Sequence, residues 1–215
     1  KRDELGLENL EFAQADILSL GQLDRSFDLI EAVGVLHHLD EPVTGWRALV
    51  GRLRPGGWMK IALYSRRARE HACAAQALLG DWGTRPTPPS MREARGRLLA
   101  LPPSHPARRI VHSRDFFSLS SFRDLLLHER EHSFDLPTLE QHSRDLGLTW
   151  VGLEVDHSIP AERWAALCPN DPDRVLPASW DRWEQEFPDT FAGMYTFWCW
   201  RPPDRERGEP ELGPP

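Results

Sequence analysis

The sequence has little cysteine, and it has no long apolar run. Cys73, Cys168 and Cys199 are an odd and widely scattered set. Such spacing predicts neither a disulfide framework nor a zinc site made of closely spaced thiolates, so we expect reduced thiols, with Cys199 in a buried strand. No apolar run approaches the roughly 20 residues that a membrane-spanning helix needs. The first residues also lack the apolar stretch of a secretory signal, and we therefore expect a cytoplasmic protein with no membrane partner.

Basic side chains are too scattered to make a nucleic-acid surface. The 215 residues include 26 Lys and Arg against 33 Asp and Glu, for a formal net charge of -7. A phosphate backbone attracts clustered positive charge, and no long stripe of Lys and Arg is present, so we expect no nucleic-acid partner. The hydrophobic content of 40% is that of an ordinary folded domain. The length predicts one domain, or one domain with an insertion.

Strand and helix patterns alternate early in the chain. Residues 27–33 are apolar enough to be a strand covered on both faces, and residues 58–64 are predicted to be a further strand. Between them, residues 42–53 carry apolar side chains at helical spacings, and residues 54–57 (Arg-Pro-Gly-Gly) end that helix. A strand, a crossover helix and a second strand of this length predict a right-handed parallel unit. A further short strand is predicted ahead of them, at residues 10–13.

The pattern becomes helical after the third predicted strand. We interpret residues 65–146 as a helical insertion on the ligand side of the sheet, containing helices at 67–79, 90–101, 115–132 and 137–147. Two strands at 149–155 and 194–200, with helices at 161–167 and 180–186 between them, complete a domain over residues 1–202. The proline-studded residues 203–215 are predicted to be a mobile tail. Residues 1–7 look like the last turn of a helix that ends at Gly6, so we expect the natural chain to begin further upstream.

Polar groups follow the predicted strands at the edge where parallel sheets bind ligands. The Asp16 carboxylate can accept a hydrogen bond from an exocyclic amine, while the backbone N–H of Ile17 donates to a ring nitrogen. That pair suits adenine. The alternative is that Asp16 only caps the following turn. After the next strand, Gly34 lets the backbone come close to a ligand.

Two adjacent histidines, His37 and His38, follow the same strand. We expect no metal there, because neighbouring side chains point in different directions and no further ligand stands at a suitable spacing. A histidine in this position acts as a general base or as a hydrogen-bonded group that fixes the loop, and both interpretations stay open.

A second polar cluster, His128 to His132, has helical spacings of three and four. It predicts either one face of a substrate pocket or a solvated, charged helix end. Tyr64, at the end of the third predicted strand, is a further candidate for the pocket because it reaches the same edge of the sheet.

Residues 27–30 with 35–39, followed by 53–61, resemble the fourth-strand and fifth-strand motifs of class I S-adenosylmethionine-dependent methyltransferases. Residues 9–17 are similar to the third-strand motif of these enzymes, whose acid commonly contacts the adenine amine. The resemblance covers residues 8–64. It implies an α/β, incomplete Rossmann-like methyltransferase sheet made of strands 3 to 7, with the helical insertion after the fifth strand and an antiparallel final pair of strands.

The resemblance also implies a cofactor and roles for the site residues. S-adenosylmethionine would be bound by Asp16 and Ile17 at adenine, with Val33, Gly34 and Leu36 forming the floor beneath it. One of the two adjacent histidines would be the base. Tyr64, His128 and His132 would line the acceptor pocket. The methyl acceptor, whether a small molecule, a peptide or a protein side chain, stays open.

One part of the family pattern is missing. The glycine-rich first motif and the ribose-binding acid do not occur in these residues and are expected upstream. The remainder of the chain is similar to a bacterial group in which this domain often follows tetratricopeptide repeats, which predicts such repeats upstream. A second hypothesis is therefore a non-catalytic, methyltransferase-like interaction module without a working cofactor site. A nicotinamide-dependent dehydrogenase is disfavoured, because its phosphate fingerprint is absent.

Overall fold

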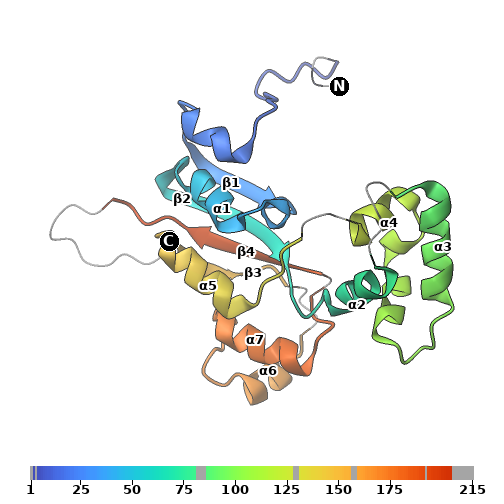
Figure 1. Ribbon diagram of the computed structural model, residues 1–215. Coiled ribbons are helices and arrows are strands. Elements are labelled where there is room, and N and C mark those ends of the chain that lie inside the picture. The colour runs from blue at the N-terminus through green and yellow to red at the C-terminus, as the bar shows by residue number, and fades with distance from the viewer. Residues whose placement is uncertain are drawn as a thin grey trace.

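A computed structural model describes residues 2, 4–80, 86–127, 131–155, 159–191 and 193–204. Within them, four strands form one mixed sheet in the order β1-β2-β4-β3 (Figure 1). The strands are β1 (Phe27–Val33), β2 (Leu53–Tyr64), β3 (Thr149–Leu153) and β4 (Met194–Trp200). β1 and β2 are parallel, whereas β4 runs antiparallel to both β2 and β3. The predicted α/β class, the parallel unit and the antiparallel final pair are confirmed.

Helix α1 (Pro42–Val50) is the crossover between the two parallel strands. It buries Trp46 and Leu49 against the sheet, and the Trp46 indole Nε1 donates to Met59 Sδ at 3.2 Å. The helix ends before residue 53 because the following residues already enter β2. They do so with a shift of register: Phe27 pairs with Leu53, but Leu29 pairs with Trp58.

The other helices fall into two groups around two separate apolar cores. Helices α2 (Glu70–Leu79), α3 (Pro88–Leu99) and α4 (Leu119–Leu126) enclose one core together with the 3-10 helices η3 (Pro106–His112) and η4 (Arg114–Phe116). We call the described residues from 70 to 127 the cap. Helices α5 (Leu136–Asp145), α6 (Ala161–Leu167) and α7 (Pro177–Glu186) pack on the sheet and share its core. Figure 1 shows the cap beside one end of the sheet.

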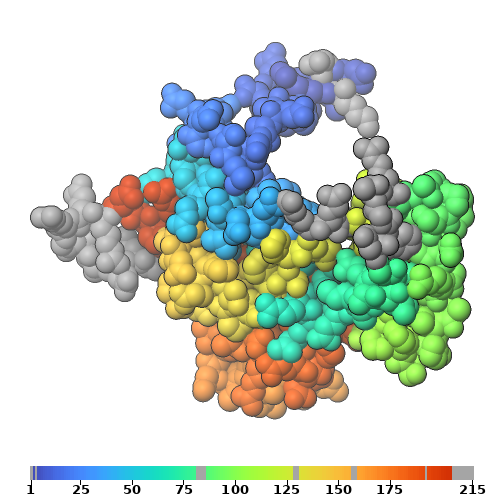
Figure 2. Space-filling view, viewed as in Figure 1, coloured from blue at the N-terminus to red at the C-terminus, as the bar shows by residue number. Residues whose placement is uncertain are grey.

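Two predicted elements were wrong. Residues 10–13 do not form a strand: all four are exposed, because no strand of the described chain lies beside them to supply hydrogen bonds. Figure 2 shows this N-terminal segment, in dark blue, projecting from the body of the molecule. The helix predicted through residue 132 ends at Leu126, and Glu131 and His132 are not helical. None of the described helices is long and apolar enough to cross a membrane. Most of the predicted tail, residues 205–215, lies outside the described residues.

Gly57 lies at the register shift of β2, where the neighbouring backbone comes close to it, and this close packing can be tested. A Cβ atom there would lie 2.8 Å from the Arg54 carbonyl oxygen and 3.0 Å from that of Asp28. We expect Gly57→Ala to lower the free energy of unfolding by roughly 1–3 kcal/mol, because backbone atoms must move. The matched control is Gly96→Ala in α3, where nothing lies within 4 Å of the new atom. Urea unfolding should show that this exposed helical position gains up to about 1 kcal/mol. Equal changes in the free energy of unfolding for Gly57→Ala and Gly96→Ala would contradict the close packing at Gly57.

Candidate functional site

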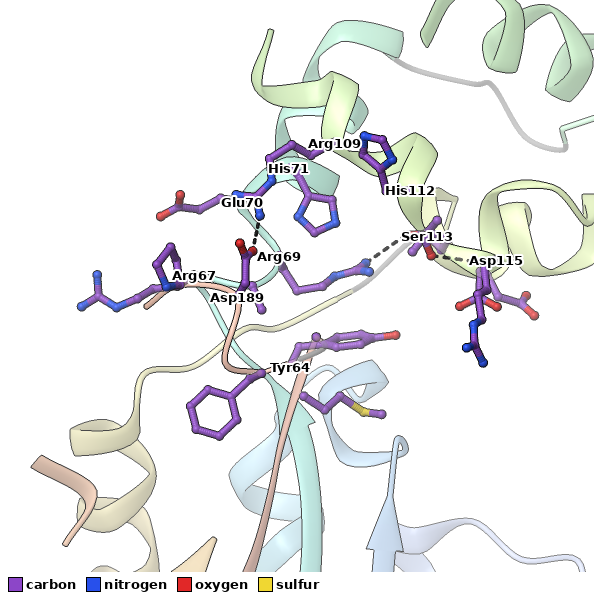
Figure 3. A pocket seen from close by; sticks show the side chains of 18 of the residues that line it. Tyr64, Arg67, Arg69, Glu70, His71, Arg109, His112, Ser113, Asp115 and Asp189 are labelled. Atoms are coloured by element: carbon purple, nitrogen blue, oxygen red, sulfur yellow. Dashed lines mark hydrogen bonds and ion pairs between the residues drawn. The ribbon is translucent and has the colours of Figure 1, made fainter. Parts of the chain in front are cut away.

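A cavity of about 1320 Å³ lies between the end of the sheet and the cap. The sheet side contributes residues that end or follow strands β1 and β2 or precede and begin β4, and the cap side contributes η3, η4 and α4 (Figure 3). The lining residues used below are Gly34, His38, Tyr64, Arg67, Arg69, His71, Arg109, Asp115, Asp124 and Asp189. Carboxyl ends of parallel strands are the usual ligand-binding edge of such a sheet, so this cavity is the candidate site.

The loop after β1 presents backbone to the cavity. Gly34 has φ of 72°, and a Cβ added there would meet nothing within 4 Å. Val33 is 47% exposed, which is high for an apolar strand residue. The neighbouring Leu36 is fully buried and lies under Gly45 of α1, so its side chain anchors the loop from the core.

Asp16 and Ile17 stand at the beginning of the 3-10 helix η1 (Ile17–Gln22). The Asp16 side chain accepts a hydrogen bond of 2.9 Å from the backbone N–H of Leu18, which is the capping alternative considered from the sequence. Asp16 is exposed, and Ile17 packs partly against the main core. This capping hydrogen bond at the start of η1 uses the Oδ1 oxygen of Asp16. A role at adenine stays a prediction.

The two adjacent histidines differ in their surroundings. His38 lines the cavity, whereas His37 is fully buried and stacks on the Tyr64 ring with centroids 3.9 Å apart. Their Nε2 atoms lie 3.1 Å apart, so one ring donates and the other accepts. Of the two candidates for the base, His38 is the one that reaches the cavity. Among the described residues, no group of three His, Cys, Asp or Glu side chains is placed to hold a metal ion.

The second histidine cluster is only partly described. His128 lies outside the described residues. The backbone N–H of His132 donates to the His37 carbonyl at 2.9 Å, so this segment runs beside the loop after β1. His132 is not among the residues that line the cavity.

Tyr64, by contrast, is a central residue of the cavity wall. Arg69 lies over its ring, with the guanidinium carbon 4.3 Å from the ring centroid (Figure 3). Burial raises the pKa of the Tyr64 hydroxyl, and the nearby Arg69 cation opposes that rise. The sequence did not single out Arg69, because Glu131, its partner in an ion pair, is 62 residues away in the chain.

Several charged residues around the cavity form ion pairs with residues of other segments. Arg109 of η3 forms an ion pair with Asp189, which lies ahead of β4, so this contact joins the cap to the sheet side (Figure 3). Arg67 forms an ion pair with Asp181 of α7, with 3.4 Å between Arg67 Nη2 and Asp181 Oδ1. Burial lowers the pKa of His71, and the Arg109 and Arg69 cations lower it further.

A buried carboxylate lies next to this wall. Glu184 of α7 is fully buried and accepts hydrogen bonds from the Ser65 hydroxyl, at 2.6 Å, and from the Tyr195 hydroxyl. Burial raises the pKa of Glu184, although the two hydrogen bonds oppose the rise. Burial and the Glu184 hydrogen bond also raise the pKa of Tyr195. The only sequence signal was an acid on the helix face that carries Trp180 and Trp183, and sequence reasoning missed it.

One segment of the chain matches a known family model. Residues 1–61 match the family model described as a methyltransferase domain. The matched segment contains β1, α1, most of β2 and the loop that presents Gly34 and His38 to the cavity. The family resemblance inferred for residues 8–64 is supported over that segment.

Longer relatives share more of the chain. An uncharacterised protein of Synechococcus sp. is 29% identical over 185 residues, which are 80% of this chain and 40% of that protein. PKMT2 from Rickettsia typhi in complex with AdoHcy has a similar fold, with a TM-score of 0.68, 12% identity, and coverage of 92% of this chain and 40% of that one. A second structure of PKMT2 gives a TM-score of 0.67 at 13% identity. The chain therefore spans about 40% of the length of these relatives.

The pH dependence of stability tests the Glu184 network. The pKa of Glu184 in the folded protein is above its ordinary value of 4.5, so the folded state holds this proton more tightly than the unfolded chain. Wild-type stability relative to Glu184→Gln should therefore be greatest below pH 4.5 and should fall as the pH rises through the raised pKa. Urea unfolding at a series of pH values measures this difference.

Two further variants separate the charge from the hydrogen bonds. Glu184→Ala should cost roughly 2–4 kcal/mol, because two buried hydroxyls lose their acceptor. The exposed Glu186→Gln on the same helix is the control for loss of one carboxylate. A Glu184→Gln protein whose stability stays parallel to wild type at every pH would contradict the raised pKa.

Proposed function

We propose that this chain forms the acceptor side and part of the cofactor side of an S-adenosylmethionine-dependent methyltransferase. The observation that carries the proposal is the cavity at the carboxyl ends of the parallel strands β1 and β2. The segment that matches the methyltransferase domain family, residues 1–61, contributes Gly34 and His38 to its wall. The similarity in fold to the AdoHcy complex of PKMT2 supports the choice of cofactor. The methyl acceptor would occupy the space between Tyr64 and the cap.

The residues after β1 fit the adenosine part of such a cofactor. Gly34 leaves its backbone open at a positive φ, and Val33 and Val35 are exposed apolar side chains beside it. Asp16, with Ile17, would hold adenine as predicted. Leu36 would support this floor from the core.

The outer edge of β1 indicates what completes the site. This strand pairs with β2 on one side, and within the described residues no strand pairs with its other side. The side chains of Leu29 and Val33 in β1 are each about half exposed, which is unusual for such an apolar strand. We propose that a glycine-rich segment upstream of these 215 residues covers this edge and binds the methionyl part. Upstream tetratricopeptide repeats and a cytoplasmic location stay predictions from the resemblance and the composition.

The chemistry asked of the chain is mainly positioning. When bound, the cofactor supplies an electrophilic methyl carbon, and the cavity residues hold the acceptor in line with it. His38 would take a proton from an acceptor that must lose one, and its Nε2 contact with His37 would hold the ring in place. Tyr64 stands at the wall as a hydrogen-bonding group for the acceptor.

The open edge of β1 also favours a rival hypothesis. A non-catalytic interaction module would use the same exposed apolar strand to bind a partner and would need no cofactor. Isothermal titration of S-adenosylhomocysteine into this chain and into a version extended upstream distinguishes the two. The methyltransferase proposal expects tight binding to the extended protein and weak or no binding to the short one. Absence of binding to both would favour the module.

Asp16 provides the sharper test within the extended protein. If its carboxylate binds adenine, Asp16→Ala should lower the affinity for S-adenosylhomocysteine about 10- to 100-fold, through loss of a charge-assisted hydrogen bond. Asp16→Ser keeps a capping oxygen for η1 and should lose affinity as well. Asp28→Ala, which removes an exposed partner of Arg54, is the control and should bind normally. Full affinity of the Ser variant would leave Asp16 with the capping role alone.

A further inference from the structure

Arg69 and Glu131 form a buried ion pair at the wall of the cavity. Arg69 donates to both carboxylate oxygens of Glu131, from Nε at 2.7 Å and from Nη2 at 2.6 Å. Nη2 also donates to the Leu125 carbonyl at 2.9 Å. The side chains are only 5% and 10% exposed. Taking two charges out of water is costly, and such a pair is weak evidence of a gain in stability, so a positional role is the more informative hypothesis.

Arg69 is the outer layer of a stack of three planar groups. The Tyr64 ring lies between the imidazole of His37, with centroids 3.9 Å apart and planes at 27°, and the guanidinium of Arg69 at 4.3 Å. A ring held between two planar groups has few other orientations available. Its hydroxyl is therefore presented from a fixed place in the cavity wall (Figure 3).

Backbone hydrogen bonds bring Glu131 to this position. The next residue, His132, donates to the His37 carbonyl at 2.9 Å, and Phe134 donates to the Tyr64 carbonyl, also at 2.9 Å. The segment that carries Glu131 is thus tied to both layers beneath Arg69. Leu125, at the end of the cap helix α4, is tied to the same guanidinium.

We propose that Arg69 and Glu131 are positioning residues of the acceptor site, forming a clamp that holds the Tyr64 ring and its hydroxyl in a fixed orientation in the cavity wall. The name acceptor site rests on the proposed function, whereas the clamp itself is tested without cofactor or acceptor. Within the described part of the chain, the charged and titratable groups that surround Tyr64 are His37 and His38 of η2 (Leu36–His38), Arg69, Asp115 of η4, Asp124 of α4 and Glu131.

The signs of these charges give opposite expectations for the two members of the clamp. The Arg69 cation lowers the pKa of Tyr64, and the Glu131 anion raises it. If the clamp is formed in solution, Arg69→Gln should raise the pKa of Tyr64 and Glu131→Gln should lower it. If both residues merely support the fold, each substitution loosens the site and exposes the ring, and both should lower the pKa.

The chain is suited to this measurement because it contains only two tyrosines, Tyr64 and Tyr195. NMR of the chain with isotope-labelled tyrosine gives one ring signal for each, and Tyr195→Phe assigns them. Arg69→Lys should keep the pKa of Tyr64 near its wild-type value, because the positive charge is kept. Arg66→Gln, which removes an exposed ion pair with Asp135, is the matched control and should leave Tyr64 unchanged.

The outcomes are distinct from those of the cofactor experiments. Opposite shifts for Arg69→Gln and Glu131→Gln, with folding checked by circular dichroism at each pH, support the clamp. Shifts in the same direction, or no shift in either variant, overturn it. Because no cofactor is present, either result is independent of whether S-adenosylhomocysteine binds.

Discussion

The hydrogen bond between Ser65 and the buried Glu184 fixes the point at which the chain leaves the sheet. Ser65 follows the last residue of β2, and its backbone N–H also donates to Gly193 just before β4. Tyr195 donates to the same carboxylate from within β4. The direction in which the chain turns toward the cap is therefore set by one charged group on α7, and the cavity wall depends on that direction.

This arrangement helps to explain why charged side chains line the cavity although the sheet behind it is apolar. The two chain segments that connect sheet and cap, around residues 65–69 and 131–134, lie beside each other and meet through backbone and charged groups. Two segments that meet in this way contribute little apolar surface of their own. Their meeting places the Arg67 and Arg69 side chains at the ligand-binding edge, next to Tyr64.

Local patterns were sufficient to predict β1, the parallel β1–β2 unit and α6, because period and composition decide these elements within a few residues. They failed at residues 10–13, since a strand exists only where a partner lies beside it. They also failed past Leu126, where contacts of Glu131 and His132 with distant residues replaced the helix. His38, Gly34 and Tyr64 were singled out from the sequence and do line the cavity. Arg69 and Glu184 were not, because their roles come from partners 62 and 119 residues away.

The apolar core of the cap shares no residue with the core beneath the sheet. Substitutions inside the cap therefore change its shape without disturbing the packing that holds the parallel strands. A lineage can therefore vary the part of the cavity wall that the cap provides while the sheet stays intact. We expect sequence differences among relatives to concentrate in the cap. The residues that connect the cap to the sheet, around 65–69 and 131–134, are expected to vary less.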